Sequence, residues 1–328
     1  MNLVTLRPLL AALAVFVGLL IAACGGESEH EGLLVVTTVA PLRNIIEEVG
    51  GDRITVVALV PEGTNSHTFD PPPSAVGELE KADLIIINGL NLELPTLELA
   101  EANASEDTPI VLLGNLAVSP DEYVFDFSFP EENGNPNPHL WTAPHLAVEY
   151  AEIVREELSK IDPGGTDYYA GNAERFIVRL WELDEAIAEA TATIPDAHRK
   201  LITYHDSFPY FAPRYDLEII GAIQPSDFSE PAPREVAQLI QQIRDAGVPA
   251  IFGSEVFPSE VLDTIAKEAG AVQVSTLSDD DLPGVPGDPE NTLVGMMVEN
   301  VRTMVTVLGG DASALDGFDT GSTWRPSE

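Results

Sequence analysis

Two hydrophobic patterns alternate along the chain. Short runs of apolar, often β-branched residues predict buried strands at 33–39, 54–60, 82–89, 109–113, 201–204, 217–223, 250–253 and 272–274. Between them, three-to-four spacing or helix-start signals predict helices at 41–50, 75–81, 146–160, 233–246, 258–269 and 291–308. Strands that alternate with helices and are apolar throughout are typical of parallel sheets covered on both faces, so the predicted fold class is α/β.

The stretch 167–194 stands between the two sets of elements. Its apolar positions keep a three-to-four spacing throughout, and neither Gly nor Pro interrupts it after Gly171. A helix of about 28 residues would span roughly 42 Å. We therefore predict two lobes joined by one long rigid helix. Two shorter helices with a hidden break are the alternative.

The N-terminus carries a processing signal. Arg7 precedes an apolar run, 9–23, that is shorter than the roughly 20 residues of a stable membrane span. Small residues then precede Cys24, an arrangement that resembles a bacterial lipobox, in which the cysteine becomes the lipid-modified first residue. We predict an extracytoplasmic protein anchored to the membrane through Cys24, in the periplasm or on the outer face of the cytoplasmic membrane. An ordinary signal peptide with a chance cysteine is the alternative.

Composition narrows the chemistry. The 328 residues include 54 Asp and Glu against 16 Lys and Arg, a net charge of −38, which excludes a general nucleic-acid or anionic-membrane binder. Because Cys24 is the only cysteine, a metal site in the mature chain must use His, Asp and Glu.

Three of the six histidines lie in unusual settings. His67, His139 and His205 are in or beside loops that contain Pro, Asn or Ser, and none is on the apolar stripe of a helix. His67, His205 and the loop 275–284 also follow predicted strands, whose carboxyl ends form the binding crevice of open α/β sheets. Neutral imidazoles with one carboxylate suit Zn²⁺. His145 and His198 are instead predicted to be structural or surface residues.

Several motifs together resemble one family, the metal-binding receptors (cluster A-I) of zinc and manganese ABC importers. The motifs are Ser66-His67 through Pro73-Ser74, Ala82-Asp83-Leu84 with Asn88-Gly89, Asn137-Pro138-His139-Leu140-Trp141, Tyr204-His205-Asp206-Ser207-Phe208 running to Arg214-Tyr215, Ser229-Glu230-Pro231, and Gly295-Met296-Met297 with Asn300. The resemblance implies two four-stranded lobes with the metal between them. It also implies that His67, His139 and His205 are ligands, the third being a histidine as in zinc-type members.

The chain departs from the family pattern at three places. Ser275 aligns with the family's fourth ligand, an aspartate, and serine cannot replace a carboxylate. We predict Asp280 for this role, with Asp279, Asp281 and Glu255 as alternatives. Ala143 replaces a polar residue that would support the site, and the loop 119–138 lacks the His-rich segment of many zinc-type relatives.

These features predict a non-enzymatic, monomeric receptor that binds Zn²⁺ with high affinity and delivers it to an ABC transporter permease, with a metallochaperone as a further candidate partner. Its affinity should fall as the pH drops through the histidine range near 6.5. A Mn²⁺ receptor, a surface adhesin and a zinc hydrolase are the alternatives. The predicted segments are a signal peptide (1–23), a tether (24–32), an N-terminal lobe (33–165), a linking helix (166–195), a C-terminal lobe (196–310) and a polar tail (311–328).

Overall fold

The computed structural model describes residues 32–254, 256 and 260–324. Cys24, the signal peptide, all but the last residue of the tether, and Glu255 lie outside these residues. In the part that is described, no helix combines the length and the apolar character needed to cross a membrane.

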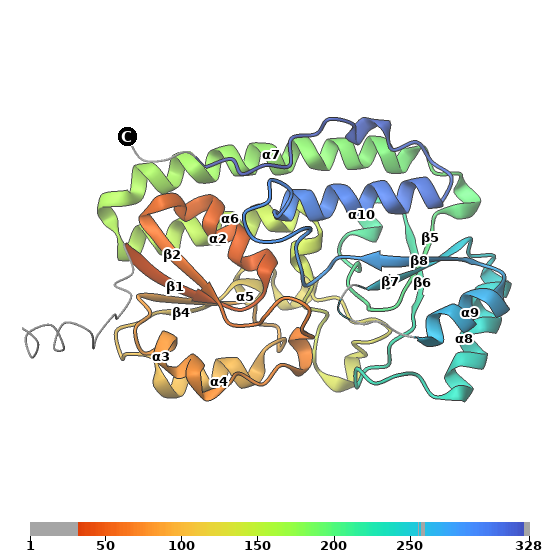
Figure 1. The fold of residues 1–328 in the computed structure, drawn as a ribbon, viewed down its shortest axis with the longest axis horizontal. Coiled ribbons are helices and arrows are strands. Elements are labelled where there is room, and N and C mark those ends of the chain that lie inside the picture. Colours follow the sequence, from red (N-terminus) through yellow and green to blue (C-terminus); the bar gives the residue numbers. More distant parts are fainter. Residues whose placement is uncertain (1–31, 255, 257–259, 325–328) are drawn as a thin grey trace, which may run out of the picture. The chain divides into compact units, whose positions relative to one another are not determined.

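The first lobe is built on a four-stranded parallel sheet with the order β2-β1-β3-β4 (Figure 1). Its strands are β1 (Leu33–Thr37), β2 (Ile54–Ala58), β3 (Leu84–Ile87) and β4 (Ile110–Leu112). The helices of this lobe are α2 (Ala40–Gly50), α3 (Val76–Leu79), α4 (Leu94–Asn103), α5 (Leu113–Ala117) and α6 (Pro144–Ile161). Pro41 in the first turn of α2 suits a helix start, because the nitrogen of proline has no hydrogen to leave unsatisfied there.

The second lobe repeats this arrangement with the order β6-β5-β7-β8, again parallel. Its strands are β5 (Lys200–Thr203), β6 (Glu218–Ala222), β7 (Ala250–Ser254) and β8 (Val272–Leu277), and its helices are α8 (Pro233–Ala246), α9 (Glu260–Ala269) and α10 (Leu293–Val307). In each sheet the first strand has the second on one side and the third on the other. Loops at the carboxyl ends of such strands diverge and leave room for a ligand.

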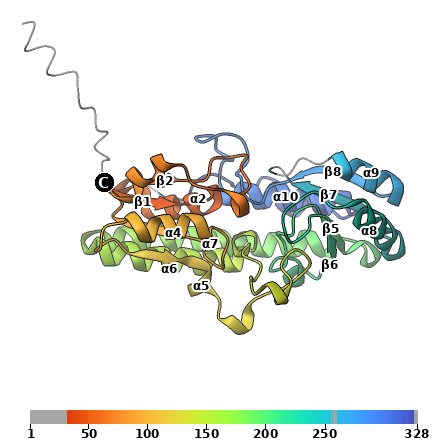
Figure 2. The same cartoon turned by 90° about the horizontal axis from the view of Figure 1, so that it is seen from below.

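The predicted long helix is confirmed as α7 (Thr166–Ala192), 27 residues without a break, so the alternative of two helices is wrong. It packs against α2 and α6 of the first lobe and against α10, as Figures 1 and 2 show from two sides. The α/β fold with two four-stranded lobes is likewise confirmed. The predicted lobe boundaries at 165, 195 and 310 stay predictions.

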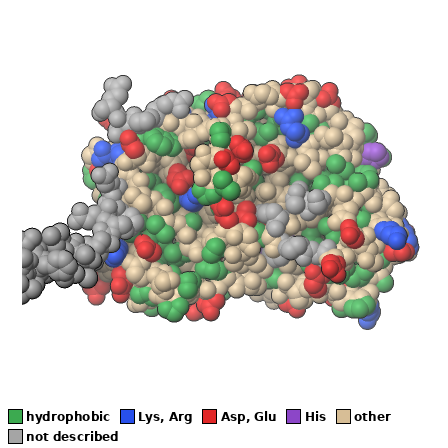
Figure 3. Space-filling view, viewed as in Figure 1, with side chains coloured by type: hydrophobic (Ala, Val, Ile, Leu, Met, Phe, Trp, Pro, Cys, Tyr) green, Lys and Arg blue, Asp and Glu red, His purple; other side chains and the backbone are tan. Residues whose placement is uncertain are grey.

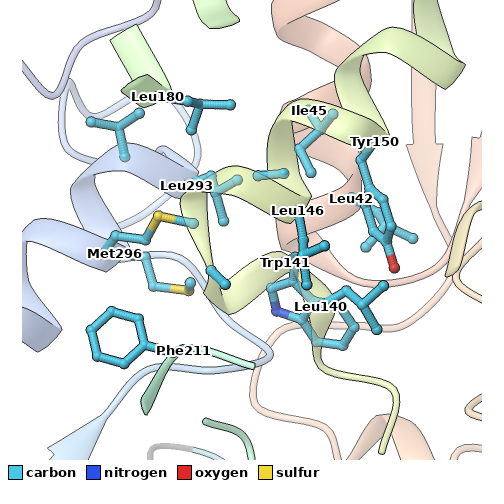
Figure 4. Close-up of a cluster of buried hydrophobic side chains, with 14 of the residues drawn as sticks. Leu42, Ile45, Leu140, Trp141, Leu146, Tyr150, Leu180, Phe211, Leu293 and Met296 are labelled. Atoms are coloured by element: carbon cyan, nitrogen blue, oxygen red, sulfur yellow. The ribbon is translucent and has the colours of Figure 1, made fainter. Parts of the chain in front are cut away.

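One hydrophobic core extends through both lobes. Figure 4 shows Leu42 of α2, Tyr150 of α6, Leu180 of α7 and Met296 of α10 in a single cluster, together with Trp141 and other buried side chains. Two smaller clusters lie in the individual lobes, one around Ile85 and one around Ile251. The lobes are therefore joined by shared apolar packing as well as by α7.

Two helices of the first lobe, α4 and α5, were not predicted. Helix α4 fully buries only Thr96 and Ala100, so its apolar periodicity is weak. The predicted helix 75–81 is shorter in the structure, because a 3-10 turn (Pro73–Ala75) precedes α3.

The described part of the polar tail, up to residue 324, packs against the rest of the chain. Leu315 is fully buried, and the backbone N–H and hydroxyl of Thr323 donate to a carboxylate oxygen of Glu48 over 2.8 and 2.6 Å.

Candidate metal centre

The three predicted histidines meet between the lobes. His67 lies in the short 3-10 turn Ser66–Thr68, which follows β2. His205 comes two residues after β5, and His139 directly precedes the turn Leu140–Thr142 that leads into α6. Their Nε2 atoms form a small triangle, with His67 3.2 Å from His139 and 3.2 Å from His205, and 3.0 Å between His139 and His205.

This triangle has the size of a metal-coordination face. Bonds of about 2.0–2.1 Å from nitrogen to a metal ion place ligand nitrogens roughly 3.3 Å apart in a tetrahedron and about 3.0 Å apart at neighbouring octahedral positions. Among the described residues, these three histidines are the only group of three or more ligand residues whose ligand atoms lie within 4.8 Å of one another. The spacing fits a divalent metal and does not by itself select one geometry.

Two amide side chains fix the direction of the imidazoles. The Nδ1 of His139 lies 2.8 Å from the Oδ1 of Asn137, which also accepts the backbone N–H of His139. The Nδ1 of His205 lies 2.7 Å from the Oε1 of Gln224, whose amide nitrogen donates elsewhere. Because these oxygens only accept, each Nδ1 carries the hydrogen, and each Nε2 directs its lone pair into the triangle.

The surroundings keep the imidazoles neutral. Burial, with a smaller effect from His205, holds the pKa of His67 well below its usual value of 6.5. Burial and the two neighbouring histidines hold the pKa of His139 well below it as well. Burial also lowers the pKa of His205, although the nearby charge of Asp280 acts in the opposite direction. Neutral imidazole is the form that binds metal, so the site is ready for an ion at neutral pH.

Asp280 lies beside the triangle and not within it. Its carboxylate is buried, and its Oδ2 accepts the hydroxyl of Ser66 at 2.6 Å and the backbone N–H of Ser66 at 3.3 Å. Ser66 directly precedes His67, and the charge of Asp280 acts on His205. Asp280 is not among the residues of the closely spaced cluster.

The neighbouring aspartates have different contacts. The Oδ1 of Asp279 accepts from the hydroxyl of Ser254 at 3.2 Å and from the backbone N–H of Asp280 at 3.1 Å. The Oδ2 of Asp281 accepts the backbone N–H of Gly63 at 2.6 Å. The indole of Trp141 donates to the carbonyl of Asp279 at 2.7 Å, which ties this loop to the turn after His139. The side chains of Glu255 and Ser275 lie outside the part that the structure describes.

The other described histidines have structural settings. His198 Nδ1 lies 3.0 Å from the carbonyl of Leu308, just after α10. Burial, with a smaller effect from the Arg214 charge, lowers the pKa of His145 to about 4. Neither belongs to the three-histidine cluster.

Four residues of the site were not predicted. Asn137 and Gln224 orient the imidazoles, and Phe129 and Phe228 cover them, with ring centroids 5.5 and 4.3 Å from that of His67. Asn137 stood inside a quoted motif, and Phe228 directly precedes another, Ser229-Glu230-Pro231. Their contacts with the histidines arise only when distant loops meet.

Comparisons with known proteins agree with this arrangement. A family profile described as "ZnuA: Zinc-uptake complex component A periplasmic" matches residues 35–307. The chain is 28% identical over 297 residues to the manganese-binding lipoprotein MntA of Halalkalibacterium halodurans, covering 89% of this chain and 95% of that protein. It is 27% identical over 275 residues to the iron-binding protein YfeA of Yersinia pestis, covering 84% and 86%.

The fold is also similar to that of the periplasmic zinc-binding protein TroA from Treponema pallidum. The TM-score is 0.76 at 25% identity, and the match covers 84% of this chain and 99% of that one. The predicted resemblance is thus confirmed: the chain belongs to the ZnuA family of metal-binding, substrate-binding proteins of ABC metal transporters, which are receptors and not enzymes.

Proposed function

We propose that this receptor carries Zn²⁺ between its lobes and delivers it to the permease of an ABC importer. The observation that carries the proposal is the triangle of three Nε2 atoms, two of them oriented by hydrogen bonds at Nδ1. A centre of three neutral imidazoles is typical of zinc, whereas manganese prefers sites richer in oxygen ligands. Divalent zinc also binds a given nitrogen site more tightly than manganese.

Asp280 is the fourth ligand in this proposal. It is buried next to the cluster, its charge acts on His205, and its two neighbours are engaged with Ser254 and Gly63. Three neutral imidazoles and one carboxylate would leave bound Zn²⁺ with a net charge of +1. Both hydrogen bonds from Ser66 use the Oδ2 of Asp280. We further propose that movement of the loop that carries Asp280 helps to release the ion.

The names of the relatives support the transport setting. MntA is called a manganese-binding lipoprotein and PsaA of Streptococcus pneumoniae a manganese ABC transporter substrate-binding lipoprotein. We infer that Cys24 carries the lipid that anchors this chain outside the cytoplasm. The metals in the relatives' names are manganese, iron and zinc, so the choice of zinc here rests on the three imidazoles.

The experiment is a pair of competition titrations with Zn²⁺ and Mn²⁺, on the full-length protein in detergent and on its Asp280→Ala variant. We expect one ion per chain and Zn²⁺ at least about a hundredfold tighter than Mn²⁺. Loss of Asp280 should weaken zinc binding by about tenfold or more. The matched control is Asp281→Ala, which removes the next carboxylate and should change zinc affinity far less. Tighter binding of Mn²⁺ would show a manganese receptor, and unchanged zinc affinity in Asp280→Ala would remove Asp280 from the site.

A further inference from the structure

Phe228 covers the histidine cluster from the second lobe. It lies in the loop after β6, whereas His67 belongs to the first lobe. The two rings are stacked, with centroids 4.3 Å apart and an interplanar angle of 18°. The Phe228 ring also lies 6.2 Å from that of His205 and 5.9 Å from that of Phe129. An aromatic side chain of one lobe thus closes over a candidate ligand of the other.

Phe228 also forms part of the wall of a cavity that leads to the cluster. The cavity has a volume of about 350 Å³, and His67, Phe129 and Phe228 line it together with Asn91 and Asn135. His139 and His205 are not in its lining, so an ion in the cavity meets His67 and Phe228 first. Acidic side chains are spread over the face in Figure 3, yet none of the described residues that line the cavity is Asp, Glu, Lys or Arg.

The backbone of Phe228 is in an unfavourable conformation. Its φ of 58° is in the left-handed region, which is uncommon for a bulky residue and persists only where neighbouring contacts impose it. Here the backbone N–H of Phe228 donates to the carbonyl of Pro225 at 3.0 Å. Its own carbonyl accepts from the amide of Gln224 at 3.2 Å.

Gln224 connects this turn to the metal site. The amide nitrogen of Gln224 donates to the Phe228 carbonyl. The amide oxygen of Gln224 accepts from the Nδ1 of His205 at 2.7 Å. The carbonyl of Gln224 in turn accepts the hydroxyl of Ser128, at 2.7 Å, from the loop of the first lobe that also carries Phe129. A change at His205 therefore reaches the backbone of Phe228 through one side chain.

We propose that Phe228 is the gate for exchange of metal between the three-histidine site and the cavity, and that Gln224 couples the gate to His205. When the left-handed turn relaxes, the ring leaves His67 and opens the cluster to the cavity. When the turn is held, the ring shields the ion from water. This inference rests on the proposed function, because it assumes that the histidines hold the ion.

A gate and a simple apolar wall have different kinetic effects. Removing a wall would loosen the site, so metal would leave faster and the dissociation constant Kd would rise in proportion. Removing a gate lowers the barrier in both directions, so association and release both become faster and Kd changes little.

The test is stopped-flow mixing of the full-length protein in detergent, followed by tryptophan fluorescence. Of the three tryptophans, Trp141 reports on the site, because its ring lies 5.1 Å from that of His139. Zn²⁺ is the probe, mixed with metal-free protein for association and removed by excess EDTA for release. For Phe228→Ala we expect both rates to rise on the order of tenfold and Kd to change by less than about threefold. Phe228→Leu keeps an apolar side chain, so its association and release rates should lie between those of the parent and those of Phe228→Ala. This variant replaces Phe228→Ala in the test if the alanine variant fails to fold.

The matched control is Phe127→Ala. This aromatic residue of the facing loop is 50% exposed and does not line the cavity, so its loss should leave both rates unchanged. Rates within about twofold of the parent in Phe228→Ala, or a Kd that rises in step with release at constant association rate, would overturn the gate. If the parent itself binds no Zn²⁺ at the histidines, the proposed function fails and the gate with it; if the parent binds and only the expected rate changes are absent, the gate alone fails.

Discussion

At the scale of single residues, the site depends on side chains that hydrogen-bond to the candidate ligands and hold them in place. Asn137 is fully buried, accepts two hydrogen bonds from His139, and donates to the carbonyl of Asp206 at 2.6 Å. It thereby fixes the tautomer of His139 and holds that residue close to the segment that carries His205. Asn88 adds a second support by donating to the carbonyl of Pro138 at 3.1 Å.

We expect Asn137→Ala to weaken zinc binding by about 10- to 100-fold, because partners that orient metal-binding histidines typically contribute this much. The measurement is competition against a chelator of known affinity. Asn135→Ala is the control. Asn135 lies in the same loop and lines the cavity, but its side-chain oxygen accepts an exposed hydrogen bond from Asn91 and not one from a histidine. Equal affinities for both variants and the parent would show that Asn137 does not position His139.

The lowered pKa values of His67 and His139 determine the pH dependence. Their pKa values in the folded protein lie well below 6.5, so at pH 6.5 the folded state holds these imidazoles neutral while the unfolded state takes up protons. The metal-free protein should therefore lose stability as the pH falls below about 6.5. Zinc affinity should stay nearly constant down to about pH 6.5 and fall only at lower pH.

This pH behaviour revises the expectation from the sequence, which placed the loss of affinity near 6.5 itself. Chelator competition and thermal unfolding at several pH values between about 7.5 and 5.5 give the two curves. A tenfold loss of affinity between about pH 7.5 and 6.5 would contradict the effect of burial on these histidines.

The residues of the candidate site could be predicted from the sequence only where their immediate neighbours in the sequence are unusual. His67, His139 and His205 stood out because Pro, Asn and Ser surround them and no apolar stripe accounts for them. Gln224 and Phe228 carry no such signal, because their partners lie in distant loops; His67 and His205 themselves are 138 residues apart. Asp280 was chosen by position among three adjacent aspartates. In the structure its own contact with Ser66 and its charge on His205 distinguish it, as do the different contacts of its two neighbours.

At the scale of elements, α7 is anchored to the loop that follows His205. The Nε and Nη2 of Arg214 donate to the two carboxylate oxygens of Asp184, each over 2.5 Å, and the hydroxyl of Tyr215 donates to Asp184 at 2.6 Å. Asp184 projects from α7 and is largely buried. This bidentate pair fixes the end of the segment that begins with the His205 motif.

We expect Asp184→Ala to destabilise the protein by about 3 kcal/mol, because it leaves a partly buried guanidinium and a buried hydroxyl without their acceptor. Denaturant unfolding of the metal-free protein measures the change. The control on the same helix is Glu182→Ala, whose exposed pair with Arg179 at 3.7 Å should contribute less than about 1 kcal/mol. Equal stabilities of the two variants would mean that the bidentate pair does not anchor α7.

Elements with a strong period were predicted well. The spacing of apolar residues identified α7, and continuous apolar runs identified the eight strands of the described residues. The pattern is clearest in β3 and β7, which are buried along their whole length, whereas β2 and β6 are only partly buried. Helix α4 is barely amphipathic, since only Thr96 and Ala100 are buried, so its sequence shows no such pattern. The packing of the tail after residue 310 was not predicted, because it depends on a few residues, among them Leu315 and Thr323, within a polar segment.

At the scale of the whole described chain, the two lobes share one core. The cluster that includes α2, α6, α7 and α10 crosses from lobe to lobe, and the backbone N–H of Leu293 in α10 donates to Asn44 of α2 at 2.8 Å. Separating the lobes widely would expose much of this apolar surface. We therefore expect metal exchange to depend mainly on the loops that carry Asp280 and Phe228, with the sheets moving little.

The most direct test of the central claim is calorimetric titration of the metal-free, full-length protein with Zn²⁺, beside its His205→Ala variant. The account predicts one ion per chain for the parent and binding at least about a hundredfold weaker for the variant, since one of three nitrogen ligands is gone. His198→Ala, which removes a histidine that contacts the carbonyl of Leu308, should bind as the parent does. Weak binding of several ions, unchanged in His205→Ala, would mean that the acidic surface collects zinc and that the three histidines do not form the site.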